Sequence, residues 1–246
     1  MTEIITKYLQ KNKYNSLDLK AVLFDMDGII YDSMPAHEKS WQQTMQEWNL
    51  KAEPNEFFNQ EGRPAIYTTN LLFQRNLKRD ATEKELEEVY KRKTELFFKY
   101  DTGALIPGIE ETIKIVKERG LIPILVTGSG QPNLWERLNG DLPGIFTPET
   151  MITAFEVKIG KPHPEPYLMG LEKAGNLKPN QALVFENAPL GVESAHKANI
   201  FTIAVNTGPL PDNVLIDSGA DLLLDSINDL NSALPKLLEK METIKV

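Results

Sequence analysis

The fold is decided by residues 21–33, which read Ala21-Val22-Leu23-Phe24-Asp25-Met26-Asp27-Gly28-Ile29-Ile30-Tyr31-Asp32-Ser33. The first four residues are apolar and favour extended structure, which predicts a buried strand of a parallel sheet. Asp25 and Asp27 follow at the end of that strand, and Gly28 permits a sharp turn after them. Ligands of open α/β sheets bind at the carboxyl ends of the strands. Because buried carboxylates need partners, the pair indicates a bound cation or a proton. Taken alone, the stretch also fits a strand-end turn without any chemistry.

The composition is that of an ordinary globular protein. The chain has 246 residues, of which 41% are hydrophobic and 25% charged, enough for one large domain or a domain with an insertion. The net charge of −8 and the lack of a basic block argue against nucleic acid as a partner. The absence of cysteine excludes disulfides, thiolate zinc sites and a cysteine nucleophile. Without an apolar run of roughly 18 residues or a signal-peptide pattern, we expect no membrane partner and a cytoplasmic location.

Beyond residue 34 the chain divides into a helical block and an alternating block. Residues 35–100 show helical spacing throughout, with a helix start at Ser33-Met34-Pro35 and a capping box at Thr82–Glu85. Short apolar runs then alternate with helices, which predicts strands at 121–127, 151–154, 182–185, 201–205 and 221–224. This alternation predicts an α/β fold, a Rossmann-like parallel sheet core with helices on both faces. We therefore expect a catalytic core of residues 1–34 and 101–246, with 1–18 as a helical arm on the surface. Residues 35–100 are expected to form an inserted all-helical cap domain.

Three later loops place polar groups at the predicted strand ends. Thr127 offers a hydroxyl, and the backbone N–H groups of Gly128 and Ser129 are suited to cradling a phosphate. An ordinary turn of an α/β protein has the same appearance. Lys161 stands between Gly160 and Pro162 in a stiff loop, where a cation can neutralise a cluster of carboxylate and phosphate. The nearby Lys158 fits a solvated surface lysine better.

The third of these loops carries Glu186 and Asn187, whose side chains supply oxygen ligands of the kind Mg²⁺ favours. Asn187 is equally suited to capping the helix that follows. Taken together and in this order, the four loops resemble the four motifs of the haloacid dehalogenase-like superfamily. The helical insertion is similar to the cap of its β-phosphoglucomutase-like branch. The resemblance covers nearly the whole chain after residue 20.

The resemblance implies a mechanism. Asp25 would be the nucleophile that forms an aspartyl-phosphate, and Asp27 the general acid and then the general base. Mg²⁺ would bridge Asp25 and the transferring phosphoryl group, with Asp25, Asp27, Glu186 and Asn187 as the expected metal residues. Thr127, Gly128, Ser129 and Lys161 would bind the phosphoryl oxygens. Family members often carry Asp where this chain has Asn187, which suggests a lower metal affinity unless Glu186 compensates.

Three residues of the predicted cap bear on the substrate, which we expect to be a small phosphorylated molecule. His37 follows the first hinge, and Glu61 and Arg63 lie in a compact turn that departs from the β-phosphoglucomutase pattern. The turn and the segment 186–192 together resemble an inorganic pyrophosphatase of the same branch, so hydrolysis of inorganic diphosphate is the expected reaction. A β-phosphoglucomutase or a sugar-phosphate phosphatase is the alternative. A non-catalytic domain that binds a partner protein ranks lower, because Asp25, Asp27 and Lys161 are all present.

Overall fold

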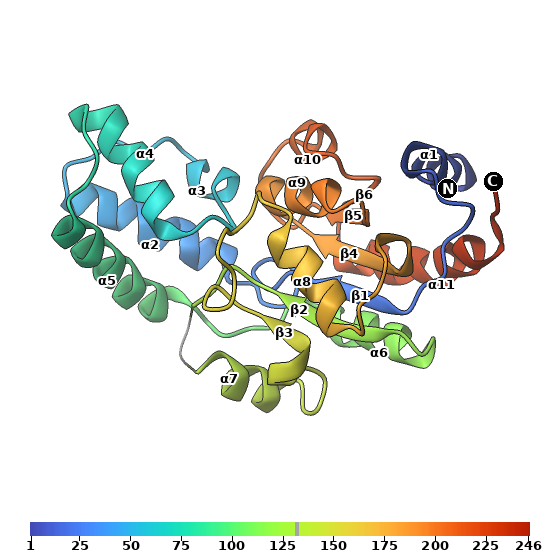
Figure 1. Ribbon diagram of the computed structural model, residues 1–246. Coiled ribbons are helices and arrows are strands. Elements are labelled where there is room, and N and C mark those ends of the chain that lie inside the picture. Colours follow the sequence, from blue (N-terminus) through green and yellow to red (C-terminus); the bar gives the residue numbers. More distant parts are fainter. Residues whose placement is uncertain (131–132) are drawn as a thin grey trace.

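The centre of the molecule is a six-stranded parallel sheet, seen in a computed structural model that describes residues 1–130 and 133–246 (Figure 1). The strands are β1 (Ala21–Phe24), β2 (Ile122–Val126), β3 (Met151–Ile152), β4 (Ala182–Glu186), β5 (Phe201–Val205) and β6 (Leu222–Leu224). Their spatial order is β3-β2-β1-β4-β5-β6, and every registered pair is parallel. All six strands lie where the apolar runs predict them, so the α/β fold with a parallel sheet is confirmed.

Helices cover both faces of the sheet because successive side chains of a strand point in opposite directions. Val22 and Phe24 of β1 belong to the larger core, with α6 (Ile109–Glu118), α7 (Leu134–Asp141) and α11 (Ile227–Thr243). Ala21 and Leu23 belong to the second core, with α8 (Glu165–Lys173) and α9 (Pro189–Lys197). The short helix α10 (Asp212–Asp217) packs against α9 and β6. Two 3₁₀ turns, Pro148–Thr150 and Pro179–Gln181, precede β3 and β4.

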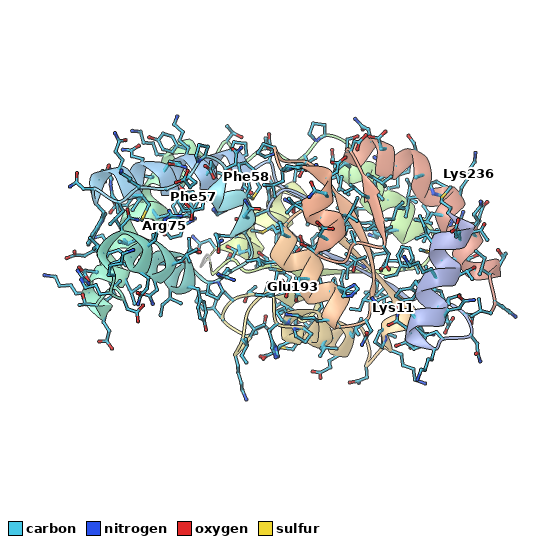
Figure 2. The ribbon with its side chains drawn as sticks, turned by 90° about the horizontal axis from the view of Figure 1, so that it is seen from above. Lys11, Phe57, Phe58, Arg75, Glu193 and Lys236 are labelled. Carbon is cyan, nitrogen blue, oxygen red and sulfur yellow. The ribbon has the colours of Figure 1, made fainter. Side chains whose placement is uncertain are left out.

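The N-terminal arm contributes apolar side chains to the larger core. Its helix α1 (Thr2–Asn12) buries Ile5, Tyr8 and Leu9 in the larger core, and the Tyr8 hydroxyl donates to the carbonyl of Asn199 at 2.7 Å. Figure 2 shows Lys11 of α1 at the end of the molecule opposite Phe57 and Phe58. One apolar face of α1 completes the core beside β5, and its other face remains exposed.

Four helices separate β1 from α6: α2 (Met34–Glu47), α3 (Glu56–Asn59), α4 (Ala65–Leu77) and α5 (Glu83–Tyr100). They bury a hydrophobic cluster of their own, in which the rings of Trp41 and Phe57 stack at 5.3 Å. The capping box predicted at Thr82–Glu85 is present at the start of α5. This separate cluster supports our proposal that residues 35–100 form a cap on the core (Figure 1).

The two segments that connect the helical block to the core run side by side. The N–H of Asp32 donates to the carbonyl of Ala104 at 2.9 Å, and the N–H of Ile106 donates to the carbonyl of Ile30 at 2.8 Å. Arg137 of α7 pairs with Asp101 at 2.9 Å, which fastens the second connection to the core. Among the described residues, none of the helices combines the length and apolar character that a bilayer crossing needs.

Candidate active site

The polar groups predicted at strand ends meet at one edge of the sheet. Asp25 directly follows β1, Thr127 directly follows β2, and Glu186 is the last residue of β4. Because β2, β1 and β4 are neighbours, their carboxyl ends place these three side chains together. All three are buried. The arrangement is the crevice in which open α/β sheets bind their ligands.

A buried lysine joins the first and third of these groups. Lys161 Nζ lies 2.6 Å from Asp25 Oδ1 and 2.6 Å from Glu186 Oε1. Burial raises the pKa of Asp25 well above its usual range, and the neighbouring Glu186 carboxylate adds to the rise while Lys161 opposes it. Burial lowers the pKa of Lys161, but the two carboxylates outweigh it and hold that pKa above its ordinary value. The ammonium thus stays charged beside the proposed nucleophile.

Both carboxylate oxygens of Glu186 accept hydrogen bonds, one of them from Lys161. Its Oε1 also accepts the Tyr167 hydroxyl at 2.9 Å, and its Oε2 accepts the N–H groups of Asn187 at 2.8 Å and Ala188 at 2.9 Å. Four hydrogen bonds therefore occupy both carboxylate oxygens. We propose that Glu186 positions Lys161, while its expected role as a metal ligand stays a prediction. The contribution of Tyr167 was not predicted, because nothing in the spacing of its helix marks it as facing the site.

Asp27 sits in a separate network that reaches into the cap. Its Oδ1 accepts from the Ser33 hydroxyl at 2.5 Å and lies 3.3 Å from His37 Nε2. His37 Nδ1 lies 2.7 Å from Lys93 Nζ. Since a lysine ammonium only donates, His37 accepts at Nδ1 and its proton belongs on Nε2, facing the carboxylate. Burial raises the pKa of Asp27, but His37, Ser33 and Lys93 together bring it below its ordinary value.

Lys93, like Tyr167, is a site residue that the sequence did not predict. It lies on α5 and is buried together with Val89, Leu96 and Phe97. Burial lowers its pKa to about 8, against the opposing effect of Glu61 and Asp27. The signal was present, because positions 89, 93, 96 and 97 follow the helical spacing of an inward face.

The side chains present fit a divalent cation. The Oδ1 atom of Asn187 is buried without a hydrogen-bond partner, a costly state that a metal ion would relieve. Its amide packs so closely on Gly28 that a Cβ there would lie 2.0 Å from Nδ2. Carboxylate and amide oxygens are the donors that Mg²⁺ prefers, so Asp25, Asp27 and Asn187 form a chemically suitable set. Nearby, ligand atoms of Asp27, His37 and Glu61 lie within 4.8 Å of one another.

The cap turn carrying Glu61 is pressed against the core loops. A Cβ on Gly62 would lie 2.9 Å from Lys161 Cδ, and one on Gly128 would lie 2.9 Å from the carbonyl oxygen of Gly62. Burial raises the pKa of Glu61, and Asp27 adds to the rise against the opposing effect of His37. Such contacts need glycine, so cap and core meet in a closed arrangement.

Between cap and core lies a cavity of about 430 Å³. Asp27, His37, Glu61 and Arg63 line it together with Gly128 and Ser129, which places these predicted residues around one space. Arg63 is half-buried and donates to Gln60 at 3.1 Å. In the loop after β2, the Ser129 N–H donates to Thr127 Oγ1 at 3.0 Å. Asp25, Thr127 and Lys161 are buried at the sheet edge and are not among the residues that line the cavity.

Comparisons with known proteins agree with this geometry. A family model for haloacid dehalogenase-like hydrolases matches residues 19–199. The solved structure "Putative beta-phosphoglucomutase from Bacteroides vulgatus" is 48% identical, with a TM-score of 0.94 and coverage of 98% of each chain. Hexitol phosphatase A of Escherichia coli is 31% identical over 212 residues, which cover 86% of this chain and 93% of that protein. Pyrophosphatase PpaX of Oceanobacillus iheyensis is 25% identical over 217 residues, 87% of this chain and 96% of that protein. The chain therefore belongs to the haloacid dehalogenase-like hydrolases.

Proposed function

We propose that the protein is a phosphohydrolase that releases phosphate from a small phosphorylated sugar or polyol through an aspartyl-phosphate on Asp25. The observation that carries the proposal is the buried Asp25–Lys161 ion pair at the carboxyl end of β1, two residues from Asp27, which lines the cavity between cap and core. Lys161 holds Oδ1 of Asp25, which orients the second oxygen for in-line attack on phosphorus. A carboxylate nucleophile divides one difficult displacement into two easier steps.

Asp27 is suited to moving the proton in both steps. In the first step the Asp25 oxygen forms a bond to phosphorus, the phosphorus–oxygen bond to the leaving group breaks, and Asp27 delivers a proton to that oxygen. In the second step Asp27 takes a proton from water as the water oxygen bonds to phosphorus. The phosphorus–oxygen bond to Asp25 breaks, which releases inorganic phosphate and restores the Asp25 carboxylate. The lowered pKa of Asp27 favours its ionised form before substrate binds. An anionic phosphate beside it raises that pKa, so the arriving substrate promotes uptake of the proton that Asp27 donates.

Asp25, Asp27 and Asn187 would hold Mg²⁺, whose charge stabilises the phosphoryl group when the ion is bound. The ammonium of Lys161 supplies a fixed charge on the other side of Asp25. The Thr127 hydroxyl and the N–H of Gly128 are proposed to donate to phosphoryl oxygens, whereas the Ser129 N–H already donates to Thr127 Oγ1.

Diphosphate hydrolysis, expected from the Glu61 turn, has less support than hydrolysis of an organic phosphate. The relative named a hexitol phosphatase is more similar to this chain than the relative named a pyrophosphatase. The cavity volume of about 430 Å³ equals the volume that about fourteen water molecules occupy in the liquid, at ~30 Å³ each. It therefore has room for a sugar or polyol beside the phosphate. A mutase is the second candidate, favoured by the 48% identity to the β-phosphoglucomutase-like structure.

The test is phosphate release and product analysis with hexitol 6-phosphates, hexose 6-phosphates, glucose 1-phosphate and diphosphate, each with Mg²⁺. We expect inorganic phosphate and the free sugar or polyol as products, and loss of turnover in Asp25→Asn. Conversion of β-glucose 1-phosphate into its 6-phosphate isomer would establish the mutase instead. A kcat/KM for diphosphate above that of every organic phosphate would restore the first expectation. Wild-type protein without any turnover would support the non-catalytic alternative.

A further inference from the structure

Two phenylalanine side chains at the cavity are highly exposed. Among the large apolar side chains of the described residues, Phe155 and Phe98 are the most exposed, at 73% and 58%. Exposing such side chains to water is unfavourable, and clusters of them often mark binding sites. Both line the catalytic cavity, and so does Tyr90, which is 48% exposed. Three exposed aromatic side chains thus share one cavity, whereas the other exposed large apolar side chains of the described residues, such as Tyr67 and Ile216, lie outside its lining.

The two phenylalanines come from opposite sides of the cavity. Phe155 follows β3 in the core, and its ring lies 3.4 Å from the position of a Cβ on Gly130, in the turn after Thr127. Phe98 lies on α5 of the cap and packs edge-on against Phe97 at 5.7 Å. A molecule that touched both rings would bridge cap and core.

Phe98 is also connected to the reacting groups. The ring of Phe97 lies 4.3 Å from that of His37, which faces Asp27. A ligand packed on Phe98 therefore rests on the same aromatic stack that holds the His37 ring. Contacts far from the phosphorus atom can in this way help to orient the proton-transferring carboxylate.

The residues that line the cavity are of two chemical kinds, charged and aromatic. Glu61, Arg63 and Lys93 offer charged hydrogen-bonding groups, whereas Phe98 and Phe155 offer aromatic rings. A phosphorylated sugar or polyol matches both, since its hydroxyls suit the charged groups and its C–H faces suit the rings. Diphosphate has no carbon surface and cannot use the rings at all.

We propose that Phe98 and Phe155 are specificity-determining residues that clamp the carbon skeleton of the leaving alcohol between cap and core. This inference rests on the proposed phosphohydrolase function and adds the residues that select its substrate class. Binding of the skeleton covers both rings, so part of the binding energy of an organic substrate stabilises the closed cap. A substrate without such a skeleton can still react at Asp25, but it does not contact the two rings.

The experiment compares sorbitol 6-phosphate with acetyl phosphate, whose acyl group is too small to span the rings. In Phe155→Ala and Phe98→Ala we expect kcat/KM for sorbitol 6-phosphate to fall about tenfold, mainly through a higher KM. Turnover of acetyl phosphate should stay within about twofold of the wild type, because this substrate does not contact both rings. A twofold change in rate corresponds to about 0.4 kcal/mol. Ile159→Ala and Leu77→Ala are matched controls, since these side chains are 49% and 46% exposed but lie outside the cavity lining.

The outcomes separate the clamp from the underlying function. Equal losses for both substrates, or unchanged discrimination in both phenylalanine variants, would overturn the clamp while leaving phosphate release by the wild type intact. Wild-type protein that released phosphate from neither compound would instead overturn the proposed function. In that case, calorimetric binding of sorbitol 6-phosphate to wild type and to Phe155→Ala still decides whether the rings bind the carbon skeleton.

Discussion

Replacing Lys161 by methionine tests the energetic basis of the site. The substitution removes the cation that lies 2.6 Å from both Asp25 and Glu186 and leaves two buried carboxylates facing each other. Breaking a buried ion pair by removing one partner costs about 3–5 kcal/mol. With a urea m-value of about 3 kcal/mol/M for a chain of this size, the unfolding midpoint should fall by about 1–1.7 M.

The assay is urea unfolding followed by circular dichroism at pH 7.5, with EDTA present so that no metal compensates for the lost charge. Lys158→Met is the matched control, because Lys158 is an exposed residue of the same loop and its replacement should change stability by at most about 0.5 kcal/mol. Adding Glu186→Gln to Lys161→Met should recover part of the loss by removing one of the opposed charges.

The stability of the Lys161→Met variant should depend on pH in a defined direction. The pKa of Asp25 is raised in the folded protein, and without Lys161 it rises further. The folded state of the variant then binds a proton that the unfolded state releases, so its stability increases as the pH falls toward the unfolded-state pKa near 4. A loss below about 1 kcal/mol at pH 7.5, or a deficit that grows on acidification, would refute the reasoning.

The remaining predictions concern closure, proton transfer and the metal. Gly128→Ala puts a methyl group 2.9 Å from the Gly62 carbonyl oxygen, so we expect a higher KM; Gly140→Ala, whose added methyl meets nothing within 4 Å, should leave the kinetics unchanged. Activity should fall as the pH rises through about 8, where Lys93 loses its proton, and a pH profile of kcat/KM for Lys93→Met should lack this limb. A profile that is unaltered in the variant argues against charged Lys93 as a participant. EDTA should abolish phosphate release and added Mg²⁺ should restore it; release that continues after exhaustive chelation argues against a metal-dependent reaction.

The main features of the fold were predictable because they rest on local patterns. The strand that precedes Asp25 is a continuous apolar run, and hydrophobic periodicity marks both buried strands and packed helices. The convergence of Asp25, Thr127 and Glu186 follows from parallel strands alone. Even the start of α5 was encoded locally, in the reciprocal hydrogen bonds between Thr82 and Glu85.

What escaped prediction depends on contacts between distant segments. Sequence alone offers Glu186 as a metal ligand, and only the fold shows that its oxygens are taken by Lys161, Tyr167 and two N–H groups. Lys93 is one of several charged residues on α5, and its burial depends on how that helix packs on α2. The preference for diphosphate failed to gain support for a related reason. The Glu61 turn describes one wall of the cavity, whereas the rings of Phe98 and Phe155 come from elsewhere in the chain.

The paired connections at Asp32–Ala104 and Ile30–Ile106 have an evolutionary consequence. Because the chain leaves and re-enters the core at neighbouring points, the segment between them can lengthen, shorten or change sequence without altering the register of β1. The geometry around Asp25 is thereby insulated from substitutions that modify the far wall of the cavity. An ancestor with this arrangement can acquire new substrates by drift in a single inserted segment, while the residues that transfer phosphate stay under constant selection.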